Sequence, residues 1–202
     1  MSQTHASTEA MALLKASGAM QATHGERTLF GHLMGTHDLL QAWGNSESVC
    51  LAGLFHSIYG TNAFERQCLA TDQRHALQTA IGAEAETLAW LFCKIDRPRA
   101  IVTGIQQLRG AASIPVAAWQ TPDGAGRQEG SATDCLLIAT ADQLYALAEM
   151  ETANLIEQGG WTQSLRDFYC LGLDHPTCLS TGAKAALHQS WQVHVNHQQV
   201  AA

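Results

Sequence analysis

Residues 29–58, LFGHLMGTHDLLQAWGNSESVCLAGLFHSI, decide the fold because they encode two apolar segments joined by a very short connection. Apolar residues recur at helical spacing in the first segment, which predicts a helix over about residues 26–43. A Gly-Asn-Ser run at 44–46 ends this helix and offers a serine to cap the next one, at 47–58. The second helix is apolar around most of its circumference, which is typical of a central helix. The short connection predicts that the two helices lie antiparallel and side by side.

The rest of the chain is expected to be helical, with one irregular interruption. A stretch rich in glycine and proline at 110–132 is expected to be a long irregular loop, in which 114–119 could form a short strand. A length of 202 residues fits one domain, so we predict a single all-α domain over residues 1–202, arranged as a helical bundle. Periodic apolar residues between breaking and capping residues predict its further helices at 7–21, 71–81, 83–94, 134–158, 162–171 and 183–197.

The charge of the chain argues against nucleic acid as a partner. There are 11 basic and 18 acidic residues, the formal net charge is -7, and the basic residues do not cluster. Binding to nucleic-acid phosphates requires a basic face, which this sequence does not provide. Only 14% of the residues are charged and 46% are hydrophobic, which predicts a weakly polar surface compatible with a homo-oligomer.

Cysteine usage and hydropathy predict a soluble, cytoplasmic protein. The six cysteines show no CxxC spacing and no secretory leader precedes them, so we expect reduced and mostly buried thiols. The longest apolar stretches are shorter than the ~20 residues that a membrane span requires, so no association with a membrane is expected.

Two histidines in the two central helices, His32 and His56, are the strongest candidates for a functional site. At about 100° per residue, His32 lies on the flank of the apolar stripe of its helix and points inward. His56 shares a face with small residues, which allow a neighbouring helix to approach closely. His37 points about 140° away from His32, so the two cannot bind one ion from a regular helix. We expect the pair to converge, either as metal ligands or as buried histidines bonded to carbonyl or hydroxyl groups.

His32, followed by the run Ala52-Gly53-Leu54-Phe55-His56-Ser57, resembles the opening of the HD-domain superfamily. There, one histidine precedes a His-Asp dyad that follows a small-apolar run, and a distant aspartate completes the motif. The resemblance implies a helical HD-like fold and a metal-dependent enzyme, most often a phosphohydrolase and less often a di-iron oxygenase. It covers about a third of the chain, and Gly31–Phe64 also resembles an uncharacterised HD-like group.

Ser57 stands where the superfamily has the aspartate of the dyad. A neutral hydroxyl binds a hard cation much more weakly than a carboxylate does. The substitution therefore argues against a two-metal centre, and it leaves open a mononuclear site, an altered ligand set or a pocket without metal. If a divalent metal is bound, iron or manganese is expected.

A third metal ligand is expected from the helix at 134–158. Glu151 falls inside its apolar stripe, about 40° from the centre, and an inward acid needs a metal, a histidine or an arginine as its partner. Asp142 fits the last motif of the superfamily better, but it points about 140° from the centre of the stripe. Asn154 and Glu157 are less well placed. We prefer Glu151 and take Asp142 as the second candidate, with an ion pair to arginine or a contact at the helix edge as the alternative for each.

Three further residues are candidates for catalysis. Glu86 flanks the apolar face of the helix at 83–94 and could reach the same core, with a surface carboxylate as the alternative. Arg66 could bind an anionic substrate or form an exposed salt bridge. Tyr59 could offer its hydroxyl to a ligand or bond to the backbone of its turn.

Together these patterns predict a metal-dependent HD-like enzyme that acts on a small molecule. A bound metal ion could generate hydroxide for attack on a phosphate or another ester, or activate dioxygen. Hydrolysis is the preferred reaction, because the sequence lacks the second carboxylate-rich histidine motif of a di-iron centre. An HD-type iron oxygenase is one alternative, and a metal-free HD-like binding module is the other.

Overall fold

The structure is a computed structural model of the chain, and it describes residues 8–24, 27–61, 67–119 and 136–200. The described part is 67% helix, in nine α-helices, and its strands form two short two-stranded sheets. The prediction of a mostly helical protein is confirmed, whereas the HD-like bundle stays a prediction. In chain order the elements are α1 (Thr8–Ala16), β1 (Thr23–His24), β2 (Arg27–Thr28), α2 (Leu29–Ala42), α3 (Glu47–Leu54), the 3-10 turn η1 (Thr71–Gln73), α4 (Arg74–Ile81), α5 (Ala83–Lys94), α6 (Arg99–Gln107), β3 (Ser113–Ala117), β4 (Leu136–Thr140), α7 (Ala141–Gln158), α8 (Gln163–Asp174) and α9 (Thr181–Val200).

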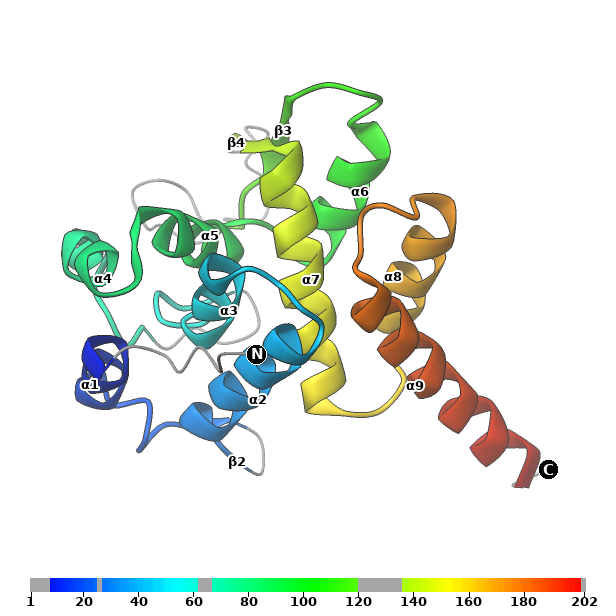
Figure 1. Cartoon of the computed structure of the whole chain (residues 1–202), viewed down its shortest axis with the longest axis horizontal. Coiled ribbons are helices and arrows are strands. Elements are labelled where there is room, and N and C mark those ends of the chain that lie inside the picture. The colour runs from blue at the N-terminus through cyan, green and yellow to red at the C-terminus, as the bar shows by residue number, and fades with distance from the viewer. Residues whose placement is uncertain (1–7, 25–26, 62–66, 120–135, 201–202) are drawn as a thin grey trace, which may run out of the picture.

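Helix α7 is the centre of the fold. Figure 1 shows it upright in the middle, with α1–α5 on one side and α6, α8 and α9 on the other. It packs against α2, α3 and α5 on the first side and against α6, α8 and α9 on the second. Residues 147–154 of α7 are buried without interruption, so every face of the helix is covered there. Polar residues in this stretch therefore need partners inside the protein.

Glu149 shows how a buried polar residue of α7 holds neighbouring elements. Its carboxylate accepts hydrogen bonds from the main-chain N–H and the hydroxyl of Ser180, which immediately precedes α9. The same carboxylate accepts a bond of 2.9 Å from Nδ2 of Asn45, in the connection between α2 and α3. One buried charge thus joins α7 to elements on both of its sides.

Helices α2 and α3 lie side by side, as their sequence predicts. The predicted cap of α3 is present, because the Ser46 hydroxyl accepts a hydrogen bond from the Val49 N–H. The two helices approach closely at Gly53, where an added Cβ would overlap Cδ1 of Leu40. Helix α3 ends at Leu54 rather than at residue 58, because Phe55 leaves helical geometry with φ −115° and ψ 12°.

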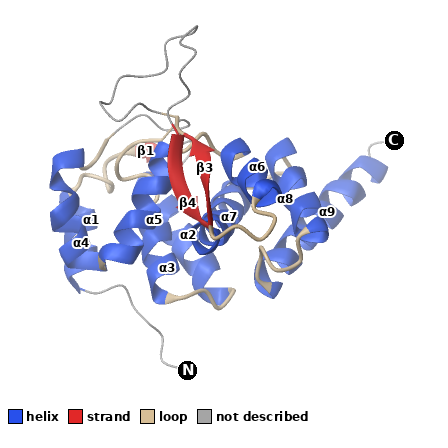
Figure 2. Cartoon of the chain, turned by 90° about the horizontal axis from the view of Figure 1, so that it is seen from above, coloured by secondary structure: helices blue, strands red, loops and turns tan. Residues whose placement is uncertain are grey.

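The segment before α7 is a strand, so the prediction of a helix from residue 134 is wrong. Strand β4 pairs antiparallel with β3, and Val116 lies opposite Leu137. Figure 2 shows this hairpin between α5 and α6. Helix α7 begins only after Thr140, whose hydroxyl accepts from the Gln143 N–H while the Gln143 side chain accepts from the Thr140 N–H. This capping box fixes the start of the helix.

Other elements agree with the sequence to different degrees. The helices predicted at 71–81, 83–94, 162–171 and 183–197 are present with small shifts of their ends. Helix α1 is shorter than predicted, and Gly18, shortly after its end, has a positive φ of 80°. Helix α6 is not predicted by the sequence pattern. Most of the predicted loop at 110–132 lies outside the described residues, and its described part contains β3 near the expected strand.

The cysteines in the described part of the chain are free, and Cys135 lies outside it. Burial raises the pKa of Cys50, Cys93 and Cys178 to about 11, so these thiols stay protonated at neutral pH and are poor nucleophiles. Cys170 is exposed, although the sequence predicts mostly buried thiols. Among the residues that the structure describes, no helix is long and apolar enough to cross a bilayer.

Replacing Gly53 by alanine tests the close approach of α2 and α3. The new methyl group must displace the fully buried Leu40 side chain, so we expect Gly53→Ala to lower the free energy of unfolding by about 1–3 kcal/mol. Gly172→Ala in α8 is the matched control, because its Cβ would come no closer than 3.3 Å to another side chain. Urea denaturation measures both variants, and equal stability changes would contradict the tight α2–α3 contact.

Candidate functional site

Helix α2 and the turn after α3 bring His32 and His56 together in the core. Their Nε2 atoms are 3.1 Å apart, and the ring centroids are 5.0 Å apart with an angle of 81° between the ring planes. Each residue is only 1% exposed. The structure thus places the two predicted site residues in direct contact, one in a helix and the other just beyond a helix end.

The Nδ1 atom of each histidine faces an oxygen that can only accept. His56 Nδ1 lies 2.7 Å from the carbonyl oxygen of Gly53, three residues back in α3. His32 Nδ1 pairs with the carboxylate of Glu157 in α7, whose side chain is 6% exposed. A carbonyl and a carboxylate accept hydrogen bonds, so both Nδ1 atoms carry a proton. In neutral rings the two Nε2 lone pairs then face each other.

Asn154 of α7 places an oxygen atom beside the Nε2 atom of His32. Its Oδ1 lies 3.0 Å from His32 Nε2, and the residue is 5% exposed. When both rings are neutral, these two nitrogens are acceptors, as is the amide oxygen, which also accepts from Gln158 Nε2 at 3.1 Å. The close approach of the two nitrogens therefore calls for a donor or a cation beside them. A proton on His32 Nε2 meets this need, and so does a cation that binds all three atoms.

The spacing of the two imidazole nitrogens is compatible with two ligands of one metal ion. Two ligands about 2.1 Å from one ion lie roughly 3.0–3.4 Å apart when the angle between them is about 90–109°. The observed separation of the two Nε2 atoms, 3.1 Å, falls in this range. Bonding of Nδ1 to a carboxylate or a carbonyl is the usual support of a metal-binding imidazole. Imidazole suits iron, zinc and copper, whereas an amide oxygen suits manganese and magnesium as well.

The described residues do not supply the carboxylates of a two-metal centre. Within that part of the chain, no three histidine, cysteine, aspartate or glutamate side chains form a metal-binding group. The third donor near the pair is the amide of Asn154, which is neutral. His37 is buried nearby in sequence, but its Nδ1 faces Asp38 at 3.0 Å. Among the described residues, the side chains around the two Nε2 atoms therefore offer two imidazoles and one neutral amide.

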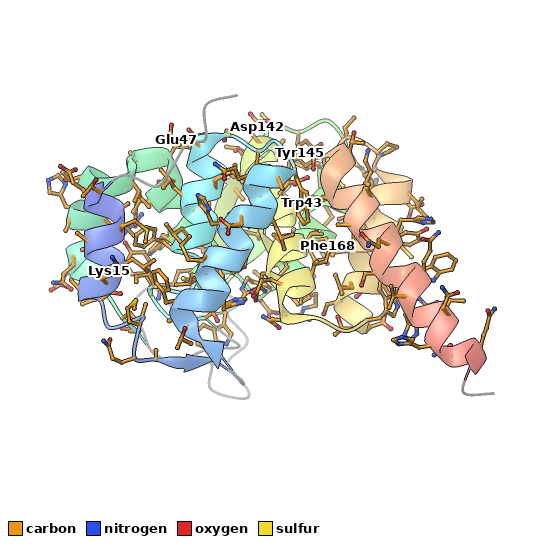
Figure 3. All side chains as sticks on the ribbon, turned by 60° about the horizontal axis from the view of Figure 1, so that its bottom comes forward. Lys15, Trp43, Glu47, Asp142, Tyr145 and Phe168 are labelled. Carbon is orange, nitrogen blue, oxygen red and sulfur yellow. The ribbon has the colours of Figure 1, made fainter. Side chains whose placement is uncertain are left out.

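The two acids predicted as third ligands, Glu151 and Asp142, lie at different distances from the histidine pair. Glu151 lies one hydrogen bond away from the pair: its Oε2 accepts from Asn154 Nδ2 at 3.3 Å and pairs with Arg97. Asp142 is exposed in the first turn of α7, twelve residues or about 18 Å along the helix from Asn154. Figure 3 shows Asp142 and Glu47 along the upper edge of the molecule in this view. The structure does not bring Asp142 to the histidines.

Asn154 and Glu157 are the site residues that sequence reasoning ranked too low. They follow Glu151 at intervals of three residues, so all three lie on neighbouring positions of one helix face. This spacing of polar residues, among the apolar residues of the second half of the helix, is the signal that could have identified them. Angles measured from the centre of the apolar stripe missed them, because α7 is buried on all sides and has no single inner face.

Glu86 and Tyr59 belong to a second buried network. Glu86, which is fully buried, accepts hydrogen bonds from the Tyr59 hydroxyl at 3.0 Å, from Arg74 at 2.6 and 2.8 Å, and from Gln78 at 3.0 Å. The carboxylate thereby joins α4 to α5 and to the turn after α3. These contacts favour a structural role for the two predicted catalytic residues. Arg66, the third one, lies outside the described residues.

The surroundings of Glu86 keep its carboxyl group ionised. Burial alone would raise the pKa of the Glu86 carboxyl, but hydrogen bonds from Arg74, Gln78 and Tyr59, with the charge of Arg74, hold it below its usual value. Burial and the nearby Glu86 carboxylate raise the pKa of the Tyr59 hydroxyl, which therefore stays protonated and donates.

Comparison with known proteins adds one finding. A family model described as a domain of unknown function (DUF6817) matches residues 13–97. This stretch is less than half of the chain; it contains both histidines and the Glu86 network, and it ends before α7. No curated protein and no solved structure matches the chain.

Glu86→Gln tests the second network and gives a pH dependence. Loss of the buried charge leaves Arg74 without its counter-ion, and because the Arg74 side chain is 32% exposed we expect a loss of about 2–3 kcal/mol of unfolding free energy at neutral pH. The pKa of the Glu86 carboxyl is lower in the folded protein than in the unfolded chain. Its ionised form therefore stabilises the fold at a pH above the pKa of the unfolded chain, and this stabilisation is lost as the pH falls through the pKa of the folded protein. The difference between wild type and variant should therefore shrink below about pH 4.5, as measured by urea denaturation. A difference that grows on acidification would contradict this assignment.

Gly35→Ala tests the pairing of His32 with Glu157. A Cβ on Gly35 would lie 2.7 Å from Cγ of Glu157, so the carboxylate must move away from the ring. We expect the ¹⁵N signals of the His32 ring to shift in an NMR spectrum of the variant. Gly31→Ala in the same helix is the control, because its nearest contact is an ordinary 3.4 Å to the Thr28 hydroxyl. That control should gain up to about 1 kcal/mol of stability, with the His32 signals unchanged. Equal spectra for the two variants would rule out the proposed contact.

Proposed function

We propose that this chain is a metal-dependent HD-like enzyme that holds one divalent transition-metal ion between His32 and His56. The amide oxygen of Asn154 serves as the third ligand. The observation that supports this proposal is the 3.1 Å separation of the two Nε2 atoms, with both Nδ1 atoms already bonded to acceptors. Iron and manganese are the expected ions, and zinc suits the same donor set.

Each residue around the pair has a defined part in this proposal. Glu157 orients the His32 ring and compensates positive charge near it, while the carbonyl of Gly53 orients His56. Burial of both rings lowers the local dielectric constant, which strengthens the electrostatic interactions of their nitrogen atoms. A bound divalent cation would supply Lewis-acid activation of water or of a substrate oxygen. The preferred reaction is hydrolysis of a small phosphate or other ester, in line with the resemblance to HD-domain proteins.

A metal-free binding module is the second candidate, and a specific observation favours it. A doubly protonated His32 would donate from Nδ1 to Glu157, and from Nε2 to both His56 and Asn154. In that state the carboxylate balances the ring charge, and the pair needs no metal. The two candidates differ in whether one proton or one metal ion occupies the space between the rings.

Metal analysis separates the two candidates. The full chain, purified without chelators, is analysed by inductively coupled plasma mass spectrometry as wild type, His32→Gln and His56→Ala. We expect about one equivalent of metal in wild type and none in either variant, because each variant removes one of three ligands. His37→Ala is the matched control, since His37 is buried in the same helix as His32 but faces Asp38.

Circular dichroism of all four proteins checks that the loss of metal is not a loss of folding. Wild-type protein that binds no added iron, manganese or zinc, while both site variants stay folded, would contradict the enzyme proposal and support the module. Where metal is bound, hydrolysis of p-nitrophenyl phosphate and p-nitrophenyl acetate, measured with and without metal, tests the reaction class.

A further inference from the structure

Glu151 contacts Asn154, the third residue of the proposed site. It lies three residues before Asn154 in α7 and is 2% exposed. Its Oε2 accepts a hydrogen bond of 3.3 Å from Asn154 Nδ2 and forms an ion pair with Nη1 of Arg97. A buried carboxylate requires partners such as these, and its bond to Asn154 connects it to the proposed site.

The direction of the Asn154 amide decides whether this residue can be a ligand. An asparagine amide has an oxygen at one end and an NH₂ group at the other, and the two ends have nearly the same shape. Only the oxygen can bind a cation, and only the NH₂ group can donate to a carboxylate. With Glu151 on one side, the NH₂ group must face the carboxylate, and the oxygen then faces His32.

The other contact of Asn154 does not fix this direction. Gln158 Nε2 donates to Asn154 Oδ1 at 3.1 Å, but Gln158 is exposed and its own amide can turn to present either end. A carboxylate has no donor in its ionised form, so Glu151 accepts in every orientation. Among these two partners, Glu151 is the one that determines which end of the amide points to the histidines.

Glu151 is itself held in place by a chain of contacts that returns to the site. The guanidinium of Arg97 lies 4.0 Å from the ring centroid of Phe92. That ring packs edge-on against His56, with centroids 5.1 Å apart and an angle of 73° between the planes. Arg97 thus binds the carboxylate while it packs on the aromatic ring that supports the second histidine. Glu151 therefore has little freedom to move away from Asn154.

We propose that Glu151 is a positioning residue: it fixes the amide of Asn154 so that the carbonyl oxygen, rather than the NH₂ group, faces the histidine pair. This inference rests on the metal site proposed above. It predicts that Glu151 affects metal binding only as long as residue 154 is an amide, because an aspartate presents an oxygen in either orientation.

A double-mutant cycle with Co²⁺ as the probe tests this prediction. The dissociation constant of Co²⁺ is measured by isothermal titration calorimetry for the full chain as wild type, Glu151→Gln, Asn154→Asp and the double variant. Glutamine at 151 can donate, so it allows the Asn154 amide to turn, and we expect Co²⁺ affinity to fall by roughly 10–100-fold. In the Asn154→Asp background the same change should cause no loss of affinity. An equal loss in both backgrounds would show that Glu151 acts through its charge, and would overturn the proposal.

A measurement on metal-free protein separates this inference from the proposed function. In ¹⁵N-asparagine-labelled protein, NMR cross-peaks between the Asn154 NH₂ protons and the His32 ring should be weak in wild type and strong in Glu151→Gln. If wild type binds no Co²⁺, the metal site fails while this comparison still decides the role of Glu151. Strong cross-peaks in wild type itself would overturn the positioning role whatever the metal result.

Discussion

The constraint on which this fold depends is the complete burial of a helix that carries polar side chains. The middle of α7 is covered on every face, yet it contains Glu149, Glu151 and Asn154. A carboxylate removed from water is strongly unfavourable unless donors replace its hydration. Each of these side chains therefore binds a different part of the chain: the start of α9 for Glu149, Arg97 for Glu151, and His32 for Asn154. The hydrogen bonds that these α7 side chains require therefore determine where the surrounding elements pack.

The same requirement explains why the candidate site lies where it does. Asn154 and Glu157, in the C-terminal half of α7, both contact His32 of α2, and His32 in turn contacts His56 just beyond the end of α3. A second buried carboxylate, Glu86, is likewise bonded to donors between α4 and α5: an arginine, an amide and a tyrosine. The two networks differ in one respect that matters for chemistry. The Glu86 carboxylate is surrounded by donors, whereas the three atoms between the histidines are acceptors when the rings are neutral.

The features that could be predicted from sequence are those with local signals. The Ser46 cap and the two apolar periods define α2 and α3, and the small residues near His56 indicate the close helix contact that Gly53 provides. The start of α7 could not be read in this way, because β4 is apolar and merges with the helix pattern, although Leu136 and Ile138 are 58% and 65% exposed. The partners of His32 in α7 are 122 and 125 residues away, so no local pattern joins them. Their identity follows only from the packing of α2 against α7.

The end of α3 at Leu54 determines the orientation of the His56 ring. His56 reaches its orientation by capping the carbonyl of Gly53, which is available because the helix stops at Leu54. If the helix continued for another turn, that carbonyl would bond to a main-chain N–H and His56 would rotate with the new turn, about 100° per residue. Substitutions that favour helix at positions 55, 57 and 58 would therefore redirect the His56 imidazole without replacing either histidine or Asn154. The residues that end α3 at Leu54 thus determine the orientation of His56, although they supply no ligand atom to the site.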